Sequence, residues 1–305
     1  MPPFTTAILY AEEMSLHTNK ENKDISNISY LCPVFRSRFG NNLFQFASHF
    51  GVSRSKNMRL IVAENTEINR VFNIDVEIRP DVKICQTFNY RREKQSCAYD
   101  DSLLRFNNSQ NVRLVRFLQS WKYFYEFRKE LRKELTFRRR IQIEAEHNIM
   151  QILLKFNEES RKMVTLVGIH IRLGDIFSNS YYKKVGFNIA TPEYLYKSVN
   201  YFLSKYRNIL FVVTSQNMTW AKENMPRHVK NKVEYIDSPK WEVIVATLSL
   251  CDHTITTVGS FSWWIGWLTG GEVTYYKWPV RDGSVLRKQF SADFSDYFYP
   301  GWIGF

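Results

Sequence analysis

The second half of the sequence alternates short apolar runs with longer segments of helical periodicity, and this alternation permits few folds. The apolar runs that we predict as strands cover residues 164–171, 209–214, 233–236, 253–258 and 273–276. Of the intervening helices, the clearest begins with Thr191 as N-cap and Pro192 at the first helical position. Strands that are apolar along their whole length are buried on both faces, so the pattern predicts a parallel sheet covered by helices. We therefore expect an α/β fold.

The first half of the chain is less regular. Residues 1–29 are polar, rich in Ser, Asn and Lys and without a sustained period, which is typical of a weakly ordered extension. A strand is expected from Tyr30, followed by a turn that contains Gly40 and by a helix with apolar residues at helical spacing. Further short strands are expected in RLIVAE and VRLVRF, and the longest helical region from Trp121 to about Phe156.

The net charge of +12 favours anionic partners, among them nucleic acid, anionic lipid and phosphate-bearing small molecules. Much of the excess lies between residues 128 and 140, where Arg and Lys interleave with Glu126, Glu130 and Glu134 at spacings that allow pairing within a helix. This interleaving favours a solvated helix face over a nucleic-acid-binding patch.

The cysteines and sequons bear on metal binding and on the cellular compartment. The four cysteines are Cys32, Cys85, Cys97 and Cys251. They include no C-x-x-C pair and have no His at ligand spacing, so no zinc site is expected, and disulfides are permitted without being required. Sequons for N-glycosylation begin at Asn27, Asn107 and Asn217, which is compatible with a secretory lumen. No run approaches the ~18 apolar residues that cross a bilayer and no signal peptide is visible, so we expect either a soluble protein or an anchor outside this sequence.

The apolar run 164–171 ends abruptly in Arg172, Leu173, Gly174 and Asp175. In an open parallel sheet, ligands bind beyond the carboxyl ends of the strands, so this polar cluster is expected at the ligand-binding edge. The planar fork of donors on Arg172 suits phosphate oxygens, and Gly174 allows the backbone to approach a ligand closely. Alternatively, Arg172 and Asp175 pair with each other at the end of the strand, and the spacing alone does not decide between these hypotheses.

Two further strand ends are expected at the same edge. Ser215 ends one of them, and Thr257, Gly259 and Ser260 follow the other. A helix is expected to begin after them, near Phe261. The backbone N–H groups of a helix N-terminus form an anion site, and the hydroxyl groups of Thr257 and Ser260 can contribute to it. Ordinary capping by Ser260 is the alternative. Together the strand ends suit a nucleotide diphosphate, although neither a Walker loop nor a G-x-G-x-x-G turn is present.

Five segments in a fixed order make a family resemblance specific. They are RSRFGNNLFQFA, LQSWKYFYEFRKELRKELTF, VGIHIRLGDI, FVVTSQNMTWAKENM and SLCDHTITTVGSFSWWIGWLTGG, and they extend from about residue 32 to 276. In this order they resemble the α-1,2-fucosyltransferases of glycosyltransferase family 11, in which the H-x-R-R-G-D motif is the most diagnostic.

The resemblance implies transfer of L-fucose from GDP-β-L-fucose to a hydroxyl of a β-galactoside glycan, with inversion and with no cofactor or obligatory metal. It implies a GT-B-like fold of two Rossmann-like domains with the donor nucleotide in the cleft between them. On this basis residues 30–160 form the acceptor-side domain and residues 161–305 the GDP-fucose-binding domain. Family members are usually Golgi membrane proteins, so a membrane anchor and a Golgi location are expected, and a nucleic-acid partner is not.

The resemblance also implies roles for individual residues. Arg172 binds the diphosphate and offsets the charge that develops on the leaving GDP, and Asp175 is the candidate catalytic base, unless it holds Arg172 in place. His170, as an alternate residue of the strand, shares a face with Arg172 and is assigned to the catalytic group. The residues assigned to donor binding are Arg38, Gly40, Asn41, Gly174, Ser215, Thr257, Gly259, Ser260 and Phe261.

The sequence departs from the family pattern at several positions. Leu173 replaces the second arginine of H-x-R-R-G-D, which removes a donor to the phosphates. In the turn before Gly40, Ser37 stands where the family has glycine, and Asn42 stands where it has glutamine. Ile244 stands where aspartate is common, with Glu242 two residues away. A non-catalytic glycan- or nucleotide-binding relative is therefore the second hypothesis, and nucleic-acid binding, which rests on the charge alone, is the third.

Overall fold

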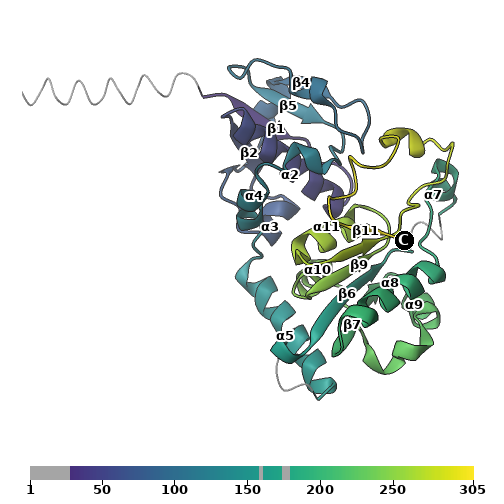
Figure 1. Cartoon of the computed structure of the whole chain (residues 1–305). Helices are drawn as coiled ribbons and strands as arrows, with labels where there is room; N and C mark the ends of the chain where they lie inside the picture. The colour runs from purple at the N-terminus through teal and green to yellow at the C-terminus, as the bar shows by residue number, and fades with distance from the viewer. Residues whose placement is uncertain (1–27, 158–160, 174–178) are drawn as a thin grey trace, which may run out of the picture.

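The computed structural model describes residues 28–157, 161–173 and 179–305, which form two α/β units, each built around one parallel sheet (Figure 1). Residues 1–27 of the predicted extension lie outside the described residues, and the first strand begins at Tyr30 as expected. Every strand pair in both sheets is parallel. The predicted α/β class is confirmed.

The first unit contains a five-stranded sheet in the order β3-β2-β1-β5-β4. Its strands are β1 (Tyr30–Pro33), β2 (Arg59–Ala63), β3 (Glu77–Arg79), β4 (Asn89–Arg92) and β5 (Val112–Val115). One face is covered by α2 (Phe39–Ser55), whose predicted apolar residues are all buried. The connections contain α3 (Glu67–Val71), η2 (Lys83–Thr87) and η3 (Asp101–Leu104).

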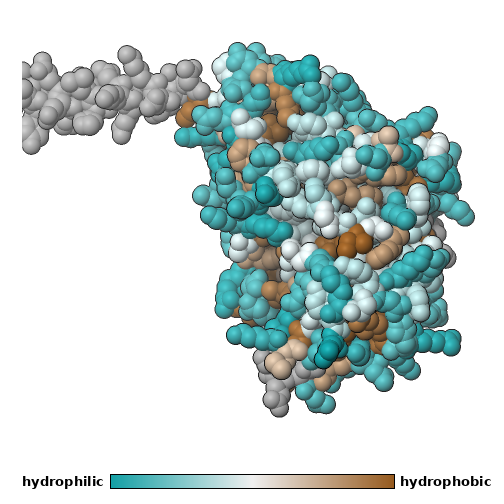
Figure 2. Space-filling model, viewed as in Figure 1, coloured by the Kyte–Doolittle hydropathy of each residue, from teal (hydrophilic) through white to brown (hydrophobic). Residues whose placement is uncertain are grey.

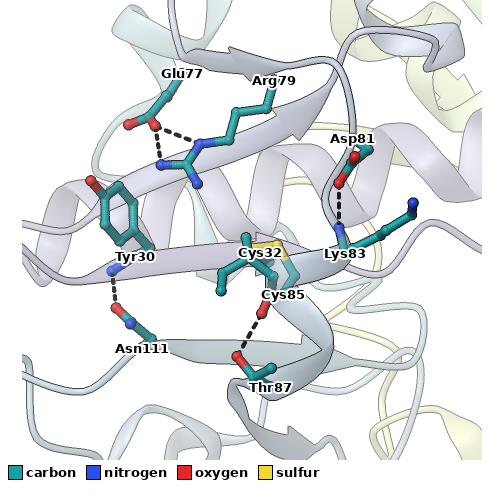
Figure 3. Close-up of a disulfide and its surroundings, with 10 residues drawn as sticks. Tyr30, Cys32, Glu77, Arg79, Asp81, Lys83, Cys85, Thr87 and Asn111 are labelled. Carbon is teal, nitrogen blue, oxygen red and sulfur yellow. Dashed lines mark hydrogen bonds and ion pairs between the residues drawn. A yellow bond between two sulfur atoms is a disulfide. The ribbon is translucent and has the colours of Figure 1, made fainter.

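The opposite face of this sheet is covered in part by η2 rather than by a long helix. A disulfide between Cys32 and Cys85 ties η2 to β1 (Figure 3). Ile61 and Phe88 join the disulfide in a small apolar cluster that is separate from the main core. The remaining two cysteines are free and buried.

The second unit contains a six-stranded sheet in the order β11-β10-β9-β6-β7-β8. Its strands are β6 (Thr165–Ile171), β7 (Ile209–Ser215), β8 (Val233–Tyr235), β9 (His253–Thr256), β10 (Val273–Tyr275) and β11 (Ile303–Gly304). The five apolar runs predicted as strands are therefore strands. Central β6 is buried along nearly its whole length because helices cover both faces, which explains its continuous apolar sequence.

Helices pack on both faces of this second sheet (Figure 1). The helices are α7 (Ser180–Val185), α8 (Pro192–Lys205), α9 (Met218–Asn224), η6 (Arg227–Lys232), α10 (Trp241–Ser249) and α11 (Ser260–Thr269). The Thr191 hydroxyl accepts a hydrogen bond from the backbone N–H of Tyr194, which confirms the predicted N-cap of α8. Alternate residues of β6 face different cores: Leu166 joins the core with α10 and α11, whereas Val167 joins the core with α8.

The expectation of one long helical region from Trp121 to about Phe156 is wrong. The segment forms η4 (Trp121–Tyr123), α4 (Arg128–Glu134) and α5 (Arg139–Lys155). Between α4 and α5 the chain is extended at Phe137, which bridges to Phe72 and packs on its ring at 4.9 Å. The Arg138 guanidinium donates to the backbone carbonyl of Asn69, so distant contacts interrupt the helix.

The predicted solvated, internally paired helix face is also only partly observed. Arg132 donates to the carbonyl groups of Trp267 and Leu268 at the C-terminus of α11, and its guanidinium lies 4.2 Å from the Trp267 ring. Glu130 pairs with Arg54 of α2, and buried Glu134 accepts from the backbone N–H of Asp75. Part of the basic cluster therefore joins elements within the protein.

Several segments join the units, among them the following two. α5 packs against α10, where the Asn148 side chain donates to the Thr247 hydroxyl at 3.0 Å. After β10, the chain returns to the first unit through η7 (Arg287–Gln289), as the yellow segment of Figure 1 shows. The visible face is mostly hydrophilic, with small separate hydrophobic patches (Figure 2). Within the described ranges, no helix is both long and apolar enough to cross a membrane.

Candidate active site

The strand order of the second sheet reverses at β6, and we call the edge at the carboxyl end of β6 the crevice. From β6 the chain proceeds to β7 and β8 on one side, and then crosses to β9 on the other side of β6. Ligands bind at such reversals of strand order in open parallel sheets. In the register of the sheet, His170 lies beside Thr214 of β7 and Thr256 of β9. The three strand ends predicted to share an edge thus lie side by side.

Thr257 fixes the point at which β6 ends. Its buried hydroxyl accepts a hydrogen bond from the backbone N–H of Arg172 at 3.0 Å and donates to the carbonyl group of His170 at 3.0 Å. One side chain therefore bonds to two backbone groups at the end of β6. These two hydrogen bonds hold the backbone of Arg172 at the carboxyl end of β6.

The Arg172 side chain lies against the loop between β9 and α11. A Cβ atom on Gly259 would lie 2.0 Å from Nη1 of Arg172 and would displace the guanidinium, and the φ of +86° at Gly259 favours glycine. On another side, the Phe187 ring centroid is 5.8 Å from the guanidinium carbon. The guanidinium is thus held beside the loop that leads into the N-terminus of α11.

His170 lies beneath this edge and is only 2% exposed. Its Nδ1 is 2.5 Å from the Ser262 hydroxyl of α11, and its ring centroid is 4.9 Å from that of Phe261. Burial, together with the charge of Arg172, lowers the pKa of His170 to about 3, so the ring is neutral at physiological pH. His170 joins β6 to α11 and does not reach solvent.

Gly40, which was predicted in a turn before the helix, lies instead in the first turn of α2, and this turn sits directly on the N-terminus of α11. A Cβ on Gly40 would lie 2.6 Å from the backbone nitrogen of Phe261, so the two units approach backbone to backbone at this point. The Asn41 side-chain oxygen accepts from the Ser260 hydroxyl at 2.7 Å and from the Gln119 amide at 2.6 Å. Gln119 lies in the family-like segment that begins at Leu118, but the sequence does not single it out, because its partner Asn41 is 78 residues away.

The alternative that Ser260 caps α11 is wrong. The N-cap residue is Gly259, with no side-chain cap, and the Ser260 hydroxyl is directed at Asn41 of the other unit. The sequence therefore predicted the correct edge of the sheet for Ser260. It did not predict its hydrogen-bond partner, Asn41, which lies 219 residues away along the chain.

The remaining predicted residues lie near this edge or outside the described part. Exposed Arg38 precedes α2, and its carbonyl group accepts from the N–H groups of Asn41 and Asn42. Ser215 pairs with Ile171 in the sheet. Gly174 and Asp175 lie outside the described residues. Of the sequons, Asn107 is exposed in a turn, Asn217 caps α9, and Asn27 also lies outside.

The departures from the family pattern have distinct environments. Leu173 is 1% exposed and belongs to the core that contains α8, so its side chain points away from the crevice. Ser37 has a φ of +71°, a conformation that favours glycine. Ile244 packs against the main core, and Glu242 lies in the first turn of α10. No group of three or more His, Cys, Asp or Glu residues able to hold a metal ion occurs in the described ranges.

Two α/β units, each built on one parallel sheet, form the architecture of the GT-B fold, and solved structures share this fold. The GDP complex of a mutant FUT1 from Arabidopsis thaliana has a TM-score of 0.52 at 11% identity, covering 82% of this chain and 71% of that one. Fucosyltransferase NodZ from Bradyrhizobium has a TM-score of 0.51 at 11% identity, covering 78% and 91%. At this identity the likeness concerns the fold alone.

The chain belongs to glycosyl transferase family 11, whose sequence profile matches residues 9–305. The galactoside alpha-(1,2)-fucosyltransferase 1 of Homo sapiens is 26% identical over 280 residues, which are 88% of this chain and 72% of the relative. The protein of the same name from Ateles belzebuth is 27% identical over 275 residues, with the same coverage. The predicted family is confirmed, and the protein is a glycosyltransferase homologous to fucosyltransferases.

Proposed function

We propose that the protein transfers L-fucose from GDP-β-L-fucose to a β-galactoside hydroxyl, forming an α-1,2 linkage with inversion. The observation that carries this proposal is the placement of Arg172, which Thr257 and Gly259 hold at the crevice beside the N-terminus of α11. The names of the curated relatives include galactoside alpha-(1,2)-fucosyltransferase, and the Arabidopsis neighbour contains GDP. These names supply the donor and acceptor of the proposal.

Arg172 provides the main electrostatic contribution in this reaction. When the bond from fucose to GDP breaks, negative charge develops on the diphosphate, and a preorganised guanidinium stabilises it. The first backbone N–H groups of α11 add positive potential from the other side of Gly259. Neutral His170 acts as a positioning residue that keeps α11 in contact with β6.

The central test is turnover by the purified chain. With GDP-fucose and a panel of β-galactosides we expect GDP release together with a fucosylated product, and Arg172→Ala is expected to lower kcat/KM about 100- to 1000-fold. Arg207→Ala removes the same charge from an exposed loop and serves as the control. If the chain neither releases GDP nor binds GDP-fucose in calorimetry, the proposal is wrong.

The catalytic base is assigned to Asp175, which deprotonates the acceptor hydroxyl. An Asp175→Asn variant with wild-type GDP-fucose affinity and reduced turnover supports this role. If the variant loses donor affinity as well, the carboxylate instead holds Arg172 in place.

A second candidate function is a glycan- or nucleotide-binding relative without catalysis. Leu173 favours it, because a buried apolar side chain occupies the position of the second arginine of the motif. Binding of GDP-fucose without any turnover supports this candidate, whereas product formation excludes it.

We further propose a Golgi or other secretory compartment for the protein. The Cys32–Cys85 disulfide supports an oxidising environment, and Asn107 offers an exposed sequon. A glycopeptide at Asn107 in protein purified from a eukaryotic host supports this location. A reduced Cys32 and an unmodified Asn107 in freshly isolated protein contradict it.

A further inference from the structure

A second basic site lies in the first unit, away from Arg172. It is a cavity of about 290 Å³ on the face of the first sheet that η2 leaves partly open. The residues that line it are Val34, Arg36, Tyr90, Arg92, Arg113, Val115 and Arg116, which we call the arginine cavity. Four of these seven residues are arginines, and none is acidic.

The strand register brings these side chains together. Tyr90 of β4 pairs with Arg113 of β5, and Arg92 pairs with Val115 two residues further on. Alternate residues of a strand share a face, so the pairs lie on the same side of the sheet. Val112 and Leu114, on the other side, are buried in the core beneath α2, so buried and partly exposed residues alternate along β5. The cavity is therefore a direct product of strand pairing.

The positive charge of the arginine cavity is not neutralised by neighbouring carboxylates. Across the described ranges, none of its four arginines forms an ion pair with Asp or Glu, and the Nε of Arg113 is buried without a hydrogen-bond partner. Arg116 is fixed by donation from Nη1 to the carbonyl groups of Glu93 and Lys94. The nearby carboxyl group of Glu93 is 1% exposed, and burial raises its pKa to about 8, so it is protonated at neutral pH.

We propose that the arginine cavity binds a sulfate ester on the acceptor saccharide. This inference rests on the proposed fucosyl transfer, and it makes acidic glycans the preferred acceptor class. Arginine donors recognise planar or tetrahedral oxyanions, and the Arg113 Nε offers a donor that the protein itself does not use. The Tyr90 ring, 66% exposed at the same cavity, provides a flat surface for a sugar ring.

Contacts connect the arginine cavity to the crevice. The carbonyl group of Arg116 accepts from the Gln45 side chain, and Gln119, three residues later, donates to Asn41, which accepts from Ser260 at the N-terminus of α11. The crevice has its own cation for the donor diphosphate, Arg172. The arginine cavity on the opposite unit is thus available for a different anion on the other substrate.

The test compares two acceptors that differ by one charge: a β-galactoside with sulfate on its 6-hydroxyl and the same galactoside without sulfate. The pocket variant combines Arg36→Gln and Arg92→Gln, both at exposed residues. The matched control combines Arg207→Gln and Arg227→Gln, which remove the same charge from exposed positions on the second unit. Thermal melts verify that both variants fold.

We expect the wild type to prefer the sulfated acceptor in kcat/KM. The pocket variant should lower the ratio of sulfated to unsulfated kcat/KM by about 10- to 100-fold, the loss typical of charge-assisted hydrogen bonds, while the control keeps the wild-type ratio. An unchanged ratio in the pocket variant overturns the inference. So does a loss of GDP affinity in calorimetry, which assigns the cavity to the donor.

A binding measurement separates this inference from the proposed function. If calorimetry with the sulfated galactoside alone shows binding that the pocket variant loses, the arginine cavity is an acidic-glycan site even when no acceptor is fucosylated. If both galactosides are fucosylated equally well by the wild type, fucosyl transfer stands and the acidic-acceptor inference is wrong.

Discussion

At the level of single residues, the buried side chains of Leu173 and His170 fix the position of the β6 end that carries Arg172. Leu173 is buried beside α8, and His170 is buried against α11. Between them along the chain lies the backbone that presents Arg172. Changes at these positions are expected to act first on folding and only then on catalysis.

We predict that Leu173→Arg destabilises the protein instead of restoring a phosphate donor. The arginine would have to enter an apolar core without a partner, so the free energy of unfolding should fall by about 3 kcal/mol or more. Urea unfolding measures this loss, and Leu173→Met, which conserves volume, should cost less than about 1.5 kcal/mol. A stable Leu173→Arg protein with increased affinity for GDP would contradict the observed orientation.

We predict that His170 makes the protein sensitive to mild acid. Its pKa is about 3 in the folded protein, against an ordinary histidine pKa of 6.5, so between these values the unfolded chain binds a proton that the folded chain does not. The contribution of His170 to the free energy of unfolding is therefore fully present above pH 6.5. Below that pH it falls by about 1.4 kcal/mol per pH unit.

Urea unfolding at pH 7.5 and pH 5.0 tests this prediction. On acidification, the free energy of unfolding of His170→Asn should fall by about 2 kcal/mol less than that of the wild type, because the variant lacks the titrating ring. His228→Asn, at an exposed histidine, should keep the wild-type difference. Residual acid sensitivity is expected in all variants because burial lowers the pKa of His49 to about 4. Equal losses in wild type and His170→Asn would show that His170 does not contribute.

At the level of elements, the loop from β9 to α11 determines where the Arg172 side chain lies. We predict that Gly259→Ala reduces activity by more than the loss of folding stability explains. The new Cβ would displace the guanidinium of Arg172. Gly301→Ala is a matched control, since Gly301 has a φ of +85° and no atom lies within 4 Å of the position that its Cβ would occupy. Both variants should lose about 1 kcal/mol of stability or more, whereas only Gly259→Ala should lower kcat/KM with GDP-fucose, by about 10-fold or more. Equal activity of the two variants would refute the prediction.

The elements also show what the sequence could and could not predict. Five of the six strands of the second sheet were predicted because burial on both faces leaves continuous apolar runs, and their shared edge follows from parallel pairing, whereas the two-residue strand β11 leaves no such run. The break between α4 and α5 was not, since Phe137 and Arg138 find their partners Phe72 and Asn69 more than 60 residues away. The Asn41 contacts were likewise hidden, because Gln119 lies 78 residues away along the chain and Ser260 belongs to the other unit.

At the scale of the whole molecule, the Cys32–Cys85 disulfide closes a loop of 53 residues that includes β2 and β3. We predict that reduction lowers the free energy of unfolding by about 2 to 4 kcal/mol. A Cys32→Ala/Cys85→Ala double variant provides the control, since its remaining cysteines are free and a reductant should leave its stability unchanged. Denaturant unfolding with and without reductant measures the effect. A wild type that is insensitive to reductant would contradict the prediction.

The segment that returns from the second unit to the first has a consequence for synthesis on the ribosome. Gln95, Tyr99 and Trp121 bond with residues 288–296, at sequence separations of 174 to 197 residues. At translation rates of about 5 to 20 residues per second, these groups wait ~10 to 40 s for their partners to emerge. The first unit therefore completes these contacts only after nearly the whole polypeptide has been translated.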